Sequence, residues 1–193
     1  TVPYRIKPFT ALLEDPKNTV EYDDQLAEKI EHRVASMGAD GKLVLNANGA
    51  VYQVNLLEKL LVPLLAKLGN LVIDGGIWMN TQRPEWNDAN NALVGQGLSM
   101  VTLYYMRRYV RFLQQTLGDK DETVEVSIEV SHWLDETARA LAEVRPLLGG
   151  DPVTAEQRYE SLALLGQAAS HCRETVYKQE GFSAKDTQSM RAI

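Results

Sequence analysis

The sequence predicts an all-α fold of antiparallel helical hairpins, joined by turns and interrupted by one long central loop. Apolar residues recur at the three- and four-residue spacing of an amphipathic helix in five separate segments. Glycine, asparagine or proline stands at the ends of most of these segments, where helices stop. A chain of 193 residues is long enough to bury one good core, so we expect a single helical domain over residues 22–180.

The first half of the chain predicts a lead-in followed by two helices. Residues 1–21 contain three prolines and no clear periodicity, which predicts an extended segment. Helical periodicity then runs over 22–37 and again over 56–68, where Pro63 predicts a kink or a break. The stretch 43–52 between them has two short apolar runs and fits either a small hairpin or a loop.

The second half predicts three longer helices and a tail. Two apolar stripes over 98–117 predict a helix that packs on more than one side. Residues 124–130 alternate like a strand, but helical spacing continues without a breaker, so we interpret all of 123–147 as helix. A capping box opens the last helix, 154–179. The polar residues 181–193 predict a mobile tail.

Net charge argues against one class of partner. The chain carries a formal charge of −6, whereas nucleic-acid binders concentrate lysine and arginine on one face. The densest basic cluster has helical spacing and is typical of the solvated face of a helix: Arg107, Arg108 and Arg111. No apolar run is long enough to span a bilayer. We therefore expect neither nucleic acid nor membrane as a partner.

Cysteine content and motifs bound the chemistry. The single cysteine, Cys172, excludes an internal disulfide and fits a reducing compartment, so we expect a cytoplasmic protein. His171 beside it points about 100° away on a helix, which disfavours shared metal ligation. The sequence has no Gly-rich phosphate loop, Cys-x-x-Cys or His-x-x-x-His, so we expect no metal or cofactor. Thr1 in place of methionine suggests a segment of a longer protein, with a missing domain or self-association completing it.

The loop from Asp74 to Gly97 is the one stretch that reads as a chemical site. Loops longer than about 12–15 residues are uncommon in compact domains unless they are functional or disordered, and tryptophans argue against disorder here. Indoles stack on the apolar faces of sugars, while amides and carboxylates bind the hydroxyls. The candidate substrate-binding residues are Trp78, Trp86, Asn80, Asn87, Arg83 and Asn90.

Glycosidic cleavage needs a protonated carboxyl at the leaving oxygen, and a second carboxylate or a phosphate on the opposite face. A carboxyl beside an indole is partly desolvated, which suits it to act as the acid. The loop offers Asp74, Glu85 and Asp88 as candidate catalytic residues. Gly75 and Gly76 beside Asp74 would allow close backbone approach to a ligand.

Trp86-Asn87-Asp88, with a helix beginning shortly after, resembles the segment that carries the general acid in cellobiose phosphorylase and related sugar-processing enzymes. The resemblance covers roughly residues 74–113. It implies an (α/α)6 toroid, the six-hairpin glycosidase fold, with Asp88 as the general acid and Glu85 as the acidic residue that the family places before the tryptophan. This chain has Ala89-Asn90-Asn91 where the family has Gly-Met-Asn. A full toroid has about twelve helices and this chain has five predicted ones, so it is either part of a barrel or a shorter helical domain that shares only the motif. Hydrolysis and phosphorolysis both stay open.

Other interpretations stand beside a glycoside hydrolase or phosphorylase fragment. Tryptophan and asparagine can organise a long loop by satisfying its own backbone, and Asp88 to Asn91 could cap the next helix. Arg83 and Glu85 could form a local ion pair. The alternative functions are a non-catalytic helical assembly module, which the two-striped helix favours, and a carbohydrate-binding domain without chemistry.

Overall fold

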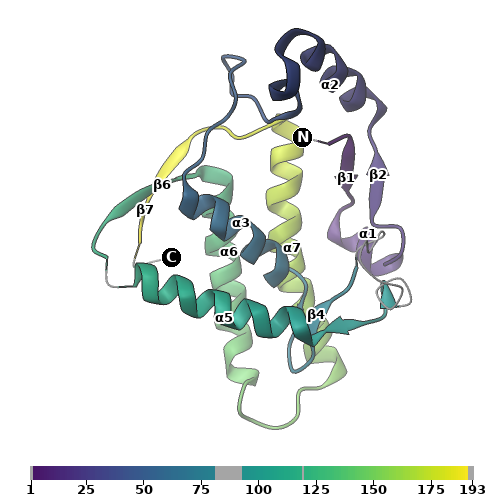
Figure 1. Ribbon diagram of the computed structural model, residues 1–193. Helices are drawn as coiled ribbons and strands as arrows, with labels where there is room; N and C mark the ends of the chain where they lie inside the picture. Colours follow the sequence, from purple (N-terminus) through teal and green to yellow (C-terminus); the bar gives the residue numbers. More distant parts are fainter. Residues whose placement is uncertain (1, 81–92, 119, 191–193) are drawn as a thin grey trace.

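The computed structural model describes residues 2–80, 93–118 and 120–190 (Figure 1). Its helices are α1 (Phe9–Glu14), α2 (Asp24–Met37), α3 (Leu56–Leu68), α5 (Met100–Leu117), α6 (Ile128–Val144) and α7 (Ala155–Gln179), with short 3-10 helices η1 (Gly38–Lys42) and η2 (Arg145–Leu147). Its strands are β1 (Tyr4–Ile6), β2 (Val20–Tyr22), β3 (Leu71–Val72), β4 (Gly76–Trp78), β5 (Leu98–Ser99), β6 (Thr123–Ser127) and β7 (Lys185–Ser189).

Helices and small sheets together build the molecule. Helices α6 and α7 form an antiparallel pair, and α3 and α5 cross it on one face (Figure 1). Strands β1 and β2 lie at one side of this layer and β6 and β7 at the opposite side. The described strands form three antiparallel sheets, β1-β2, β3-β4-β5 and β6-β7. The prediction of an all-α, (α/α) toroid fold is therefore wrong: the fold is mixed α and β.

The N-terminal residues are more ordered than the extended lead-in that the sequence predicts. Strands β1 and β2 pair antiparallel, with Tyr4 opposite Tyr22, and the two rings pack edge to face with their centroids 5.2 Å apart. Asp23 joins this hairpin to α2, because its carboxylate accepts from the Leu26 amide and from Arg5 Nε, both at 2.9 Å. The two strands are only three residues long, which is too short for an alternating pattern to show in this proline-containing segment.

Helices form at all five places that the periodicity predicts, although the fourth begins at Ile128 rather than at residue 123. Asn55 caps α3 by accepting from the amide of Glu58 at 2.8 Å, and Thr154 caps α7 through the predicted capping box. Helix α3 continues through Pro63 without a break. Between α2 and α3, the possible hairpin over 43–52 is reduced to one antiparallel bridge, Leu45 with Val51.

The predicted helix 123–147 is confirmed from Ile128 onward, as α6 and η2, and is wrong for residues 123–127. Residues 123–127 form β6, which pairs along its whole length with β7, so the alternation at 124–130 was a true strand signal. Strand β7 lies inside the expected tail 181–193. Its sequence, Lys-Asp-Thr-Gln-Ser, has no apolar pattern, so only the pairing with β6 shows that it is a strand.

The main core lies where α3, α6 and α7 meet β6. Its buried side chains are Leu65, Val126, Val130, Trp133, Ala168 and Ala169. Small residues let the helices approach closely: a Cβ added to Gly69 would stand 2.7 Å from the Cβ of Ala169. Burial of this apolar surface supplies most of the driving force for folding. The same close approach brings the end of α3 against α7, where the site described next lies.

Candidate functional site

Most of the predicted sugar site falls outside the described residues. Arg83, Glu85, Trp86, Asn87, Asp88 and Asn90 all belong to the stretch 81–92. The structure places the other three candidates, Asp74, Trp78 and Asn80, which lead up to that stretch. Of these three, only Asn80 lines a cavity.

Asp74 occupies the turn between β3 and β4, in a left-handed conformation with φ of 55°. Its carboxylate accepts a hydrogen bond from Arg158 Nη2 on α7 at 3.1 Å, and its side chain is 62% exposed. Exposure screens this ion pair, so it contributes little to stability. Asp74 does not line either cavity of the described structure.

Trp78 has a structural role in the described part of the chain. Its ring packs against the buried cluster of Phe9, Leu12 and Leu162, and its Nε1 donates to the carbonyl of Gly95 at 3.2 Å. The indole is half-buried, and these contacts tie it to the core and to the Gly95 backbone.

A cavity of about 670 Å³ lies between the β1–β2 hairpin, α1, the end of α3 and the middle of α7. Its size is in the range of small-molecule sites. Aromatic rings form part of its wall, from Tyr4, Tyr22 and Phe9, and Trp133 and Gly166 contribute from the helical side. Tyr4 and Tyr22 are 44% and 52% exposed, so their rings remain accessible to a ligand.

Polar side chains on this cavity are held in place by hydrogen bonds among themselves. Asn80 Nδ2 donates to Oδ1 of Asn70 at 2.7 Å, and Asn70 Nδ2 donates to the carbonyl of Ala66 at 3.0 Å. Thr19 Oγ1 donates to the Asn80 carbonyl at 3.1 Å. Thr19, Asn70 and Asn80 all line the cavity, which therefore presents oriented amides beside aromatic faces.

Two cations also line the cavity. Lys67 is exposed at the end of α3, and Arg173 is partly buried on α7. Arg173 Nε is fully enclosed and has no hydrogen-bond partner among the described residues. Burial lowers the pKa of the Arg173 guanidinium, because desolvation disfavours its charged form.

Sequence reasoning missed most of these residues. Tyr4, Thr19 and Tyr22 lie in the segment predicted as a lead-in, and Arg173 lies on a long helix that is rich in polar residues. Strands β1 and β2 are three residues long and α1 lies between them, so no local pattern in the sequence indicated their pairing. The sequence around Arg173 did not predict that this residue lies near β1 and β2.

A smaller cavity of about 190 Å³ lies between α6 and α7. His132, Glu136, His171 and Cys172 are among its lining residues. His171 Nδ1 lies 2.8 Å from the Glu136 carboxylate, so the histidine engages an acid on the neighbouring helix rather than Cys172. Burial, helped by the nearby Glu129 carboxylate, raises the pKa of the Cys172 thiol to about 12. That thiol is not an activated nucleophile.

Cys172 is therefore expected to alkylate slowly in the folded protein. At pH 8, its reaction with iodoacetamide should be about a hundredfold slower than in urea, because the thiolate is the reacting species. Raising the pH from 8 to 10 should accelerate the folded reaction steadily, since the raised pKa lies above this range. The unfolded chain should instead level off near the ordinary thiol pKa of about 8.5. A plateau near pH 9 in the folded protein would contradict the raised pKa.

Ser127 and Lys185 form a second arrangement that resembles nucleophile chemistry. Lys185 Nζ lies 3.3 Å from Ser127 Oγ, and Glu58 accepts hydrogen bonds from both residues. However, Ser127 is 0% exposed and neither cavity reaches it. A substrate cannot approach this hydroxyl, so the arrangement holds α3, β6 and β7 together.

In comparisons with known proteins, neither a protein-family model nor a curated protein matches the chain. Within the described residues, no group of three or more histidine, cysteine, aspartate or glutamate side chains is placed to hold a metal ion. The helices of that same part of the chain are all too short or too polar to cross a membrane. The larger cavity is therefore the strongest candidate site in the described structure.

Proposed function

We propose that this chain is a cytoplasmic carbohydrate-active domain and that its larger cavity binds part of an oligosaccharide. The observation that carries the proposal is the position of Asn80. This residue belongs to the stretch whose composition suggested sugar binding, and it lines the cavity together with tyrosine rings and a second amide. The chain segment that follows Asn80 contains the Trp86-Asn87-Asp88 motif.

The cavity has the chemical mixture that sugar recognition needs. A pyranose offers an apolar face for an aromatic ring and hydroxyls for amides. The rings of Tyr4 and Tyr22 are accessible, and their edge-to-face contact fixes their orientation. Asn70 and Asn80 are oriented by their mutual hydrogen bond, which reduces the entropy that binding would lose.

For catalysis, we propose Asp88 as the general acid, as its resemblance to the cellobiose phosphorylase segment implies. Glu85 is the better second carboxylate, because Asp74 already pairs with Arg158 and lies off the cavity. The substrate would be a glucoside-like oligosaccharide. Loss of turnover in Asp88→Asn with retained binding would support this assignment, and unchanged turnover would contradict it.

A thermal-shift screen tests the binding proposal. Gluco-, manno- and chito-oligosaccharides are each added to the whole chain. A ligand at about a hundred times its Kd stabilises the native state by about 2.7 kcal/mol. We expect one sugar class to raise Tm, and we expect Tyr22→Ala and Asn80→Ala to abolish the shift. Tyr159 on α7 is 57% exposed and lies outside the cavity, so Tyr159→Ala is the matched control.

Retention of the shift in Tyr22→Ala and Asn80→Ala would place the sugar elsewhere. Absence of a shift with every sugar would contradict the proposal and favour the second candidate function.

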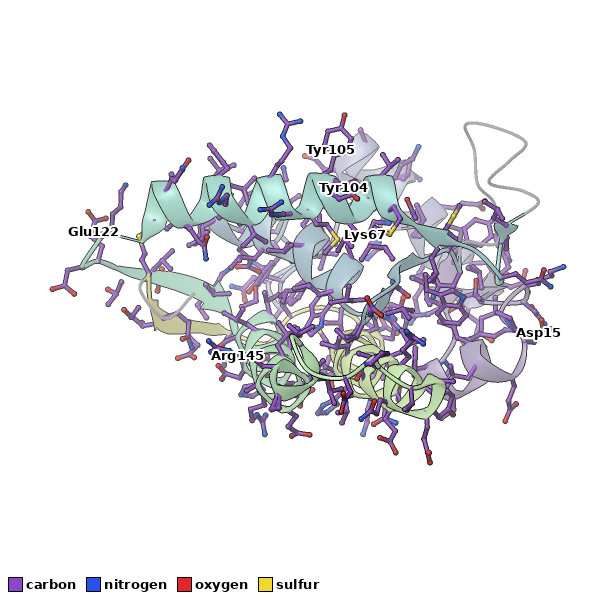
Figure 2. All side chains as sticks on the ribbon, turned by 90° about the horizontal axis from the view of Figure 1, so that it is seen from below. Asp15, Lys67, Tyr104, Tyr105, Glu122 and Arg145 are labelled. Atoms are coloured by element: carbon purple, nitrogen blue, oxygen red, sulfur yellow. The ribbon has the colours of Figure 1, made fainter. Side chains whose placement is uncertain are left out.

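The second candidate is a non-catalytic assembly module, in which α5 associates with a second copy of the chain. Six apolar or aromatic residues along and just before α5 are each more than 40% exposed: Leu98, Met100, Val101, Tyr104, Tyr105 and Phe112. Figure 2 shows α5 along the edge of the molecule, with Tyr105 on its outer side. Arginines on the same helix would complement the acidic surface expected of a chain with net charge −6.

Light scattering tests this second candidate. We expect a dimer that Val101→Glu and Tyr105→Glu convert to a monomer, because a charge in an apolar interface is costly. A monodisperse monomer over a hundredfold range of concentration would contradict it.

A further inference from the structure

The charged side chains that line the larger cavity are all positive. Among the described residues, its charged side chains are Lys67 and Arg173, and no aspartate or glutamate lines it. This is unexpected in a chain with a net charge of −6 and 26 acidic residues. Thr19, Asn70 and Asn80 add no charge, so both charged groups on the cavity wall are cations.

Arg173 is partly buried on α7 and lies on the wall of the cavity. Its Nε is enclosed and has no hydrogen-bond partner in the described part of the chain. Glu174, the carboxylate whose charge acts on Arg173, also accepts a hydrogen bond from Ser170 Oγ at 2.7 Å. Burial disfavours the charged guanidinium more than the neighbouring Glu174 favours it, and this lowers the pKa of Arg173. An anion in the cavity would offset this cost of burial.

We infer that the ligand of this cavity is a saccharide that bears an acidic group, either a carboxylate or a phosphate, with Arg173 as its counter-ion. The inference rests on the proposed saccharide function and names the class of sugar. Tyr4 and Tyr22 hold the apolar face of the ring from the hairpin side. The acidic substituent points toward α7, where the planar guanidinium offers several donors. Lys67, exposed at the end of α3, attracts the anion without fixing its orientation.

Matched neutral and acidic sugars test this inference by isothermal titration of the whole chain. The probes are cellobiose, mannobiose, the C6-oxidised uronate of each, the 6-phosphate of each, and inorganic phosphate. We expect the acidic form of one disaccharide to bind about tenfold to a hundredfold more tightly than its neutral form, because a charge-assisted hydrogen bond replaces a neutral one. The uronate and phosphate arms show which acidic group the site prefers.

Variants assign the preference to Arg173. In Arg173→Gln, we expect the acidic preference to fall below about threefold while affinity for the neutral disaccharide stays within about threefold. Arg173→Lys should retain part of the preference, because it keeps the charge. Arg139 on α6 is exposed and lies off the cavity, so Arg139→Gln is the matched control. Circular dichroism confirms that each variant folds, and the comparison of acidic and neutral sugars in the unsubstituted chain needs no variant.

The outcomes separate the two proposals. Equal affinity for neutral and acidic disaccharides would overturn the acidic-sugar inference and leave the saccharide function standing. Binding of neither kind would overturn the saccharide function, and the inference would fall with it. Inorganic phosphate binding as tightly as the sugar phosphates would also overturn the inference, because the site would then recognise an anion without its sugar.

Discussion

Replacing Glu58 with alanine is expected to lower the free energy of unfolding by about 3–5 kcal/mol. Glu58 is 2% exposed and accepts hydrogen bonds from the Ser127 amide at 3.0 Å, the Ser127 hydroxyl and Lys185 Nζ at 3.0 Å. Alanine would leave the Lys185 ammonium, 25% exposed, without its counter-ion, and the Ser127 amide buried without an acceptor. Urea denaturation of the purified chain measures the change.

Two further variants test how the ion pair between Glu58 and Lys185 contributes to stability. Lys185→Met should destabilise comparably, because it strands the Glu58 carboxylate in the core. The double variant Glu58→Leu with Lys185→Met should lose less than either single variant, since an apolar pair of similar volume removes both desolvation penalties. A loss below about 1 kcal/mol in Glu58→Ala would contradict the buried network.

Local patterns predicted the helices better than the sheets. Helices α2, α3, α5 and α7 show in the sequence because each has an apolar face and most have a capping residue that bonds within three positions. Strand β7 is stabilised by β6, which lies nearly sixty residues away in sequence, and its own residues are mostly exposed. No window of the sequence contains that interaction, so the strand was interpreted as a tail.

The cavity shows the same division. Asn80 was predicted because the residues around it are chemically unusual, and that signal is local. Arg173 reaches the site only because α7 lies beside β1 and β2, which are far away in sequence (Figure 1). Trp78 packs on a core cluster, and composition alone cannot distinguish such an indole from one that stacks on a sugar.

Gly166→Ala is expected to destabilise the protein, because Phe9 of α1 packs directly against Gly166 of α7. In the middle of an exposed helix, glycine to alanine is expected to stabilise by about 0.5–1 kcal/mol. Here a Cβ would stand 2.1 Å from Cε2 and 2.3 Å from Cζ of Phe9, a ring that is 3% exposed. The ring cannot move without displacing α1, so we expect the unfolding free energy to fall by about 2–3 kcal/mol instead.

When Phe9 is replaced first, Gly166→Ala should raise the unfolding free energy instead of lowering it. Phe9→Ala is itself expected to lose about 3–5 kcal/mol, because it empties the cluster shared with Leu12 and Leu162. In that background the added methyl group meets no ring, and Gly166→Ala should stabilise by about 0.5–1 kcal/mol. The four proteins of this double-mutant cycle are compared by urea denaturation. Destabilisation of similar size in both backgrounds would show that Phe9 does not lie against Gly166, and it would remove the helical wall from the proposed sugar cavity.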